Sequence, residues 1–307
     1  MRSRLGWTRF GLEGAWFAAG SWFGLKWVGM NSVAIFGVGL IGGSFALALR
    51  KAGFSGRIIG VSSTETIGRA LELGVIDEGM AARDAAQAAD LIYLAQPILR
   101  IIETLPELDA WVRPEALVTD AGSTKRMIVE RASAISRCQF LGGHPLAGRE
   151  QRGVEAAQAD LFQGRPYVLT PRSGAELEIG QVREFIGWIE KIGAFPVILS
   201  PAEHDEVVAY TSHLPQLAST ALATMLEGRS AAKSGVFGPA LVDSTRLALS
   251  SFDIWGDILA TNREPIRSAL KRYIAQLEEF TQVLDDRKIE EHFRAAAKFA
   301  SELRDRR

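Results

Sequence analysis

Short apolar runs rich in β-branched residues alternate with helical patterns over the first part of the chain. The run from Val33 to Phe36 precedes glycines and a helical pattern from Leu40 to Lys51. Further runs lie in GRIIGVSS, ADLIYLAQP, ALVTDAGSTK, QFLGGHPLAG and PYVLTP, with helical patterns in TETIGRALELG and from Lys125 to Ser136. Strands that alternate with helices predict an α/β fold built on a doubly wound parallel sheet.

The pattern changes after Pro171. ELEIGQVREFIGWIEKIGA predicts an amphipathic helix, FPVILSP predicts one more short strand, and from Ala202 onward apolar residues recur at three- and four-residue spacing. We therefore expect a sheet domain over residues 31–171 and an all-α C-terminal domain over residues 172–307. Its alanine-rich helices would pack either against a second copy, as a homodimer, or against one another within one chain.

Residues 1–30 show no strong periodicity, although Arg2, Arg4 and Arg9 precede an aromatic stretch. Glycine, serine and Lys26 interrupt that stretch, which argues against a signal peptide or a membrane span. We interpret residues 1–30 as a disordered extension, or as residues that precede a native start at Met30.

Composition and charge exclude several classes of function. The chain has 307 residues, is 47% hydrophobic and 23% charged, and carries a formal net charge of −1. That balance gives no general attraction to nucleic acid or to acidic membranes. The single cysteine, Cys138, excludes a disulfide framework and predicts a cytoplasmic protein with a packed, inert thiol. No spacing of histidines and carboxylates indicates a metal site.

The sequence G-V-G-L-I-G follows the first strand and opens a helix, which is the context that a dinucleotide-binding loop requires. The first glycine permits a tight turn, the second admits a pyrophosphate, and the third lets the helix pack against the strand. The helix N-terminus offers N–H groups to the phosphates. A glycine-rich packing turn is the alternative, but the context favours a Rossmann-type domain. The loop residues are Gly37, Val38, Gly39, Leu40, Ile41 and Gly42.

The residue that contacts the cofactor's ribose lies about 20 positions further on. Ser62 occupies that position, Ser63 and Thr64 follow, and Glu65 is the first acid. No carboxylate stands there to repel a 2′-phosphate, and no arginine stands there to bind one. The cofactor is therefore NAD or NADP, with the hydroxyl groups slightly favouring NADP.

Three segments follow strands and should meet at the carboxyl ends of the sheet, where open α/β sheets bind ligands. They are LAQP with Gln96 and Pro97, which we expect near the cofactor, TDAGSTK with Ser123, and GGHPLAG with His144. Ser123 would line the site, and it is also a candidate cap for the next helix. His144, on a bare, rigid turn of glycines and proline, would be either an accessible imidazole or a satisfied structural one.

From Val33 to the last helices, the chain resembles the prephenate/arogenate dehydrogenase family of tyrosine biosynthesis. The stretches that carry the resemblance are IFGVGLIGGSFALALR, TDAGSTK, GGHPLAGRE, LFQGRPYVLTP, HDEVVAYTSHLPQ and DSTRLALSSFDIWGDI. The resemblance implies oxidative decarboxylation of prephenate, in which C4 gives a hydride to NAD(P)+, its hydroxyl becomes a carbonyl, and CO2 leaves as the ring aromatises. Arogenate, which carries an amino group where prephenate has a keto group, is the alternative substrate.

The resemblance also implies roles for individual residues. His144 would accept the proton of the substrate hydroxyl, because a neutral imidazole is a suitable base near neutral pH. Ser123 would form a hydrogen bond near the same hydroxyl. Arg246 in DSTR would bind a substrate carboxylate, with a surface ion pair to Asp243 as the alternative.

Ser212 and His213 of TSHLPQ would lie around the substrate, in a helix that Pro215 bends or begins. Many prephenate-preferring members of the family carry a histidine where this chain has Gln216, whose amide can donate a hydrogen bond but carries no charge. The substrate preference therefore stays open. Glu150 would lie near the mouth of the site, with an exposed, solvated glutamate as the alternative.

For His204 and Asp205, at the start of that helix, we expect structural roles: Asp205 caps or orients a neighbour, and His204 supports the site from behind. Trp255 would either reach the site of a partner subunit or pack in the core. Two further interpretations remain from the residues alone. One is another dehydrogenase with a helical second domain, of the 3-hydroxyisobutyrate type, and the other is a redox-sensing nucleotide-binding protein.

Overall fold

One mixed sheet forms the centre of the first part of the chain in the computed structural model, which describes residues 29–149, 151–229 and 235–305. The eight strands lie in the order β3-β2-β1-β4-β5-β6-β7-β8. Neighbouring strands run parallel except β6 and β7, which run antiparallel. The strands are β1 (Ser32–Phe36), β2 (Arg57–Val61), β3 (Glu78–Gly79), β4 (Leu91–Leu94), β5 (Leu117–Asp120), β6 (Gln139–Pro145), β7 (Pro166–Thr170) and β8 (Phe195–Ile198).

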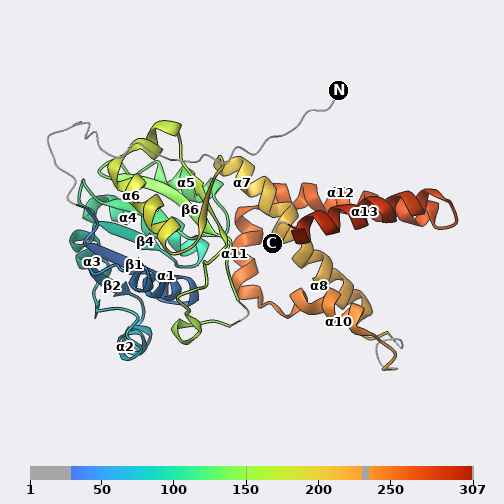
Figure 1. The fold of residues 1–307 in the computed structure, drawn as a ribbon, viewed down its shortest axis with the longest axis horizontal. Coiled ribbons are helices and arrows are strands. Elements are labelled where there is room, and N and C mark those ends of the chain that lie inside the picture. Colours follow the sequence, from blue (N-terminus) through green and yellow to red (C-terminus); the bar gives the residue numbers. More distant parts are fainter. Residues whose placement is uncertain (1–28, 150, 230–234, 306–307) are drawn as a thin grey trace.

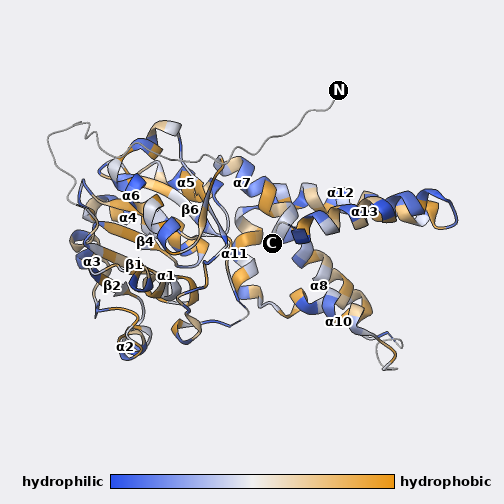
Figure 2. Cartoon of the chain, in the orientation of Figure 1, coloured by the Kyte–Doolittle hydropathy of each residue, from blue (hydrophilic) through white to orange (hydrophobic). Residues whose placement is uncertain are grey.

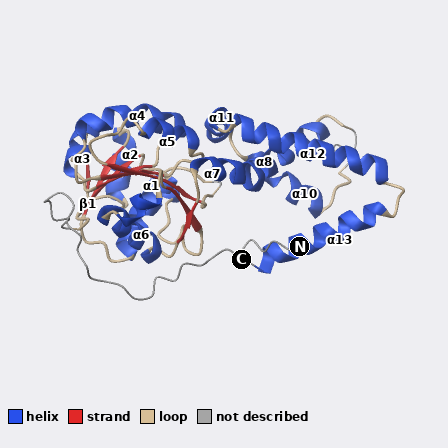
Figure 3. Ribbon diagram, turned by 90° about the horizontal axis from the view of Figure 1, so that it is seen from above, coloured by secondary structure: helices blue, strands red, loops and turns tan. Residues whose placement is uncertain are grey.

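Helices cover both faces of this sheet, as the alternating pattern predicts. They are α1 (Leu40–Lys51), α2 (Thr64–Glu72), α3 (Ala82–Ala88), α4 (Ile98–Trp111), α5 (Arg126–Ala132) and α6 (Gly180–Lys191). Seen from above, α3, α4 and α5 lie on one face and α1 and α6 on the other (Figure 3). The hydrophobic pattern singles out neither α3, which is short, nor α4, which contains Pro106.

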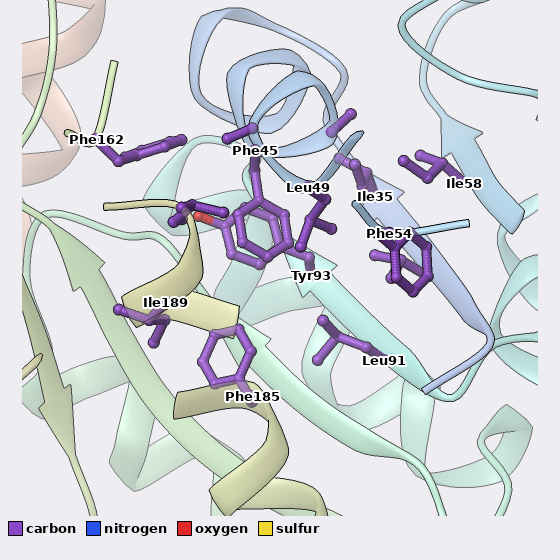
Figure 4. Packing of buried hydrophobic residues seen from close by; sticks show 14 of the residues in the cluster. Ile35, Phe45, Leu49, Phe54, Ile58, Leu91, Tyr93, Phe162, Phe185 and Ile189 are labelled. Atoms are coloured by element: carbon purple, nitrogen blue, oxygen red, sulfur yellow. The ribbon is translucent and has the colours of Figure 1, made fainter. Parts of the chain in front are cut away.

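The side chains of each strand alternate between two cores. In β1, Val33 and Ile35 join the core beneath α1 and α6, while Phe36 joins the core beneath α3, α4 and α5. Figure 4 shows the first core, where Phe45 of α1 stacks on Tyr93 of β4 with ring centroids 4.0 Å apart. Because helices cover both faces, the central strands β1 and β4 are buried along their whole length, which is the reason that they could be recognised from the sequence.

The sheet continues past the domain boundary that we expected at residue 171. Helix α6 packs into the first core, and β8 pairs in parallel with β7, so the sheet extends to Ile198. The helical part begins at Pro201. Residues 1–28, in the expected N-terminal extension, lie outside the described residues. Met30 is buried, and its backbone N–H donates to Glu184 of α6.

The second part of the chain is helical, as predicted. Its elements are α7 (Pro201–Val208), the π-helical turn η3 (Ala209–His213), α8 (Leu214–Leu226), α10 (Pro239–Thr245), the 3₁₀ turn η4 (Arg246–Leu249), α11 (Phe252–Thr261), α12 (Arg263–Val283) and α13 (Lys288–Asp305). Figure 1 shows α7 and α11 against the sheet domain, with α8–α10 and α12–α13 extending away from it. Of the two predicted roles of Pro215, to bend or to begin a helix, the structure shows the second, because Pro215 lies in the first turn of α8, which follows the π-helical turn.

The helices that extend from the body expose apolar side chains. Helix α13 has no buried residue among those described, and Figure 2 shows hydrophobic and hydrophilic residues mixed along α12 and α13. Exposed large apolar residues of this part include Leu249 at 83% and Phe252 at 74%. Within the described residues, no helix combines the length and apolar character needed to cross a membrane. Cys138 is buried, which raises the pKa of its thiol to about 12 and matches the expected inert cysteine.

Candidate active site

The glycine-rich loop between β1 and α1 has the geometry that a pyrophosphate-binding loop requires. Gly37 has a φ of 94°, and a Cβ there would lie 2.7 Å from the carbonyl oxygen of Ala95. A Cβ on Gly42 would lie 2.2 Å from the carbonyl oxygen of Gly37, whereas one on Gly39 would meet no described atom within 4 Å. The loop thus packs tightly at both ends and is open in the middle, where a phosphate would approach the backbone.

The loop lies at the point where the strand order reverses. Strand β1 has β2 on one side and β4 on the other, so the ends of β1 and β4 flank the crevice that binds ligands in such sheets. Gln96 and Pro97 follow β4. The backbone of Gln96 packs closely against the loop, since a Cβ on Gly37 would lie 2.9 Å from the backbone nitrogen of Gln96. Thr104 donates a hydrogen bond to the side-chain oxygen of Gln96. Contacts of Gln96 and Pro97 with a cofactor stay a prediction.

The hydroxyl groups at the end of β2 differ in what they can still bind. The Ser63 side chain caps α2 by accepting from the backbone N–H of Thr66, and it also bonds the Thr66 hydroxyl. Ser62 and Thr64 are exposed. Contacts of Ser62, Ser63 and Thr64 with a cofactor stay a prediction, and the choice between NAD and NADP stays open.

His144 lies on a strand, and the expectation of a bare turn was wrong. The pairing of β6 with β5 ends at Leu141. Strand β6 nevertheless continues through Pro145, because β7 pairs with it in the antiparallel direction and places Val168 opposite His144. The two preceding glycines serve close packing: a Cβ on Gly142 would lie 2.3 Å from Thr170 Oγ1. The half-buried imidazole therefore has a rigid strand backbone at the carboxyl edge of the sheet.

Two residues of α7 extend from His144 in a chain of hydrogen bonds. His144 Nδ1 lies 2.8 Å from His204 Nε2, and His204 Nδ1 lies 2.8 Å from Asp205 Oδ1. His204 and Asp205 are buried. The sequence predicts a supporting role for His204 but gives no sign of this direct contact, because the two histidines are 60 positions apart.

Burial keeps the histidines of this site neutral. It lowers the pKa of His144 well below its usual range, and the neighbouring His204, Lys125 and His213 lower that pKa further. Burial also lowers the pKa of His204, although its hydrogen bond to Asp205 opposes the shift. The pKa of His213 falls to about 4, mainly through burial. A neutral imidazole at position 144 is the form that can accept a proton.

Asp205 also caps α5, in place of Ser123. Its carboxylate accepts from the backbone N–H groups of Lys125 at 2.6 Å and Arg126 at 2.9 Å, at the N-terminus of that helix. Ser123 is partly exposed at the corner between β5 and α5. The alternative in which Ser123 caps the helix is therefore wrong, while its predicted place beside the reacting hydroxyl stays a prediction.

His213 lies behind the site with Asn262 and Trp255. Asn262 Nδ2 donates to the carbonyl oxygen of Asp205 at 2.7 Å and lies 3.2 Å from His213 Nδ1. The Trp255 ring contacts His213 edge to face, with centroids 5.8 Å apart. Asn262 therefore joins α7, η3 and the start of α12, and the sequence contains no motif that predicts it. Ser212, the neighbour of His213, is exposed.

Gln216 and Arg246 belong to one local arrangement. The Gln216 amide is buried and donates to the carbonyl oxygen of Leu247 at 2.8 Å. Leu247 is the residue that directly follows Arg246. Ser219, one helical turn along α8, accepts from the backbone N–H of Ala248. Arg246 is exposed. Gln216 thus supports the turn that carries Arg246, and direct binding of substrate by either residue stays a prediction.

Glu150 lies outside the described residues. Among those that are described, no group of three or more histidine, cysteine, aspartate and glutamate side chains could hold a metal ion.

A dinucleotide loop at the switch point of the sheet, together with a neutral imidazole at the carboxyl end of β6, defines a nicotinamide-dependent dehydrogenase of the Rossmann class. The family model described as "Prephenate dehydrogenase, nucleotide-binding domain" matches residues 45–198, and "Prephenate dehydrogenase, dimerization domain" matches residues 200–298. The chain belongs to the prephenate dehydrogenase family.

Individual relatives agree with this assignment. The chain is 34% identical to a prephenate dehydrogenase of Bacillus subtilis over 86% of this chain and 73% of that protein. It resembles the crystal structure of prephenate dehydrogenase from A. aeolicus in complex with hydroxyphenyl propionate and NAD+, with a TM-score of 0.83 and 30% identity over 91% of this chain and 100% of that one. It also resembles Synechocystis arogenate dehydrogenase, with a TM-score of 0.76 and 30% identity over 89% and 99% of the two chains.

Proposed function

We propose that this protein catalyses the oxidative decarboxylation of prephenate to 4-hydroxyphenylpyruvate, with hydride transfer to NAD(P)+. The observation that carries the proposal is the hydrogen-bond chain from His144 through His204 to Asp205. A carboxylate only accepts, so neutral His204 carries its proton on Nδ1 and accepts at Nε2. His144 must then donate from Nδ1, which leaves the lone pair of its Nε2 available as a base.

The glycine loop supports NAD(P) as the cofactor. Gly37 and Gly42 have no room for a Cβ, while the backbone at Gly39 is open to an approaching phosphate. Residues 37–42, the ends of β2 and β4, and the N-terminus of α1 would hold the dinucleotide. When bound, its nicotinamide ring supplies the hydride acceptor.

A single base is sufficient to balance the protons in the proposed oxidative decarboxylation. As the hydride leaves C4, His144 accepts the proton of the C4 hydroxyl, and the oxygen forms a carbonyl. Loss of CO2 from the ring carboxylate then leaves its electron pair in the ring, which aromatises, and the proton returns to the phenolic oxygen. The net loss from the substrate is one hydride and one CO2. Asp205 holds His204, and His204 holds the His144 ring, in the orientation that this proton transfer needs.

The remaining predicted residues would bind and orient the substrate. We infer that Ser123, beside the carboxyl end of β5, forms a hydrogen bond with the reacting hydroxyl. Arg246 offers a planar pair of donors to a carboxylate, and the bonds from Gln216 and Ser219 to its turn would keep it in place.

Arogenate is the second candidate substrate, and Gln216 is the observation that favours it. Many prephenate-preferring members of the family carry a histidine at this position, whereas this chain has a neutral amide that is already engaged with Leu247. The similarity to Synechocystis arogenate dehydrogenase supports the same alternative.

The test is an assay of the purified protein with prephenate and arogenate, each with NAD+ and NADP+, following the absorbance of the reduced nicotinamide. We expect turnover of prephenate with at least one of the two cofactors. Turnover of arogenate alone would establish the second candidate, and no turnover in any of the four combinations would contradict the dehydrogenase assignment.

We also propose that the protein is a homodimer formed through its helical part. The second family model, with its description as a dimerization domain, covers α7 to α13, and this part exposes Leu249 and Phe252 to the extent of 83% and 74%. The double variant Leu249→Glu/Phe252→Lys is expected to shift the molar mass in light scattering from dimer to monomer. A monomeric wild-type protein would contradict this proposal.

A further inference from the structure

A buried ion pair lies directly beneath the proposed base. Asp120 ends β5, and Lys125 precedes α5. Both side chains are completely buried, and the Lys125 ammonium forms an ion pair with Asp120 Oδ2. Replacing such a pair with apolar residues of the same volume is often neutral for stability, so stability alone gives little reason for burying these two charges.

The ion pair forms hydrogen bonds with both backbone groups of Gly143, the residue before His144. Lys125 Nζ donates to the carbonyl oxygen of Gly143 at 2.7 Å, and Asp120 Oδ1 accepts from the backbone N–H of Gly143 at 3.1 Å. A Cβ on Gly143 would lie 2.6 Å from the backbone oxygen of Asp120, so glycine is required for this approach. The backbone of β6 is therefore fixed where it leaves β5, one residue before the imidazole.

Lys125 also connects to the other end of the hydrogen-bond chain. Its backbone N–H donates to Asp205 Oδ1, the oxygen that also contacts His204 Nδ1. One residue thus contacts the strand that carries His144 and the carboxylate that orients His204. The groups that lower the pKa of His144 are His204 of α7, His213 of η3 and Lys125, while Asp205 and Asp120 raise the pKa of His204.

We propose that Lys125 is a positioning residue that, together with Asp120, sets the orientation of His144 and keeps its imidazole neutral. The orientation follows from the two hydrogen bonds to Gly143. The neutral state follows from a positive charge in the same buried region, which disfavours a second one on the ring. The Lys125 ammonium accordingly lowers the pKa of His144.

The test compares Lys125→Met with the double variant Asp120→Asn/Lys125→Met and with Lys51→Met, which removes an exposed lysine at the end of α1. The measurements are the pKa of His144 from an NMR titration of its ring, assigned with His144→Asn, the kinetic constants kcat and KM, and Tm. Only the kinetic arm rests on the proposed function, so the NMR arm tests the inference even if prephenate is not the substrate.

In Lys125→Met we expect the pKa of His144 to rise, kcat to fall by about 10- to 100-fold with little change in KM, and Tm to fall by roughly 10 °C because Asp120 is left unpaired. The double variant should recover most of the lost Tm while its kcat and the pKa of His144 stay altered. Lys51→Met should match the wild type in all three measurements.

A purely structural role predicts a different outcome. The double variant would then recover kcat and the wild-type pKa of His144 together with its Tm, and that result would overturn the proposal. An unchanged pKa of His144 in both variants would overturn it as well. If Lys125→Met does not fold, the double variant alone tests the proposal, because it leaves no unpaired charge buried.

Discussion

His144→Asn is expected to lower kcat by about 10²–10⁴-fold, the usual contribution of a positioned general base. The asparagine amide can still donate toward His204 Nε2, so the hydrogen-bond chain and the fold should persist while the proton acceptor is lost. Initial rates of nicotinamide reduction measure the effect, and thermal unfolding checks the fold. The matched control is His292→Asn in α13, away from the site, which should leave the rate unchanged.

The pH dependence of the wild-type enzyme follows from the same residue. A base works only when unprotonated, and burial lowers the pKa of His144 well below its usual range. The acid limb of kcat/KM should therefore lie below the reference histidine pKa of about 6.5, with a flat profile from there to about pH 9. A His144→Asn variant whose rate stays near that of the wild type between about pH 6 and 9 would show that another group is the base.

Two glycines of one loop should differ in how the same added methyl group changes the stability of the protein, although both changes should weaken cofactor binding. Gly42→Ala places a Cβ 2.2 Å from the carbonyl oxygen of Gly37, so we expect a loss of about 1–3 kcal/mol in the free energy of unfolding and a loop that no longer binds cofactor. Gly39→Ala adds its Cβ in open space, on backbone with φ −97° that alanine adopts. Its stability should match the wild type, while its NAD(P) affinity should fall about tenfold or more.

Denaturant unfolding and fluorescence titration with each cofactor measure the two effects separately. If Gly39→Ala bound NAD(P) like the wild type, the pyrophosphate would not approach the loop at this residue. If Gly42→Ala were as stable as the wild type, the close packing between the loop and α1 would not limit the fold.

Local patterns predicted most of the fold because its central strands are short runs that are buried on both faces. The glycine loop was also predictable, since its three glycines and the flanking strand and helix lie within one short stretch. The antiparallel course of β7 was not, because nothing in PYVLTP states which neighbour it pairs with or in which direction. Because of the same pairing, His144 lies in a strand and not in the turn that the sequence predicts.

The site was predictable only where its residues lie in recognisable motifs. His144 and Ser123 follow strands, and the rules for open sheets bring such residues together. The contact of His144 with His204 depends on how α7 docks against the sheet domain, which is a tertiary property. Asn262 has the least local signal of all, because its role arises from two bonds to residues far away in the sequence. The Asp–x₄–Lys spacing of Asp120 and Lys125 at a strand end is a signal that could have been used.

Asp205 connects the two parts of the chain. Its carboxylate comes from the first helix of the C-terminal part, yet it closes the N-terminus of α5 and orients the histidine behind His144. The proposed base and the groups that orient it therefore lie on either side of the junction near residue 200. A sheet domain produced alone would keep its nucleotide loop and His144, but it would lose the partner that fixes the proton on Nδ1. We therefore expect a separated sheet domain to bind the cofactor and to lack dehydrogenase activity.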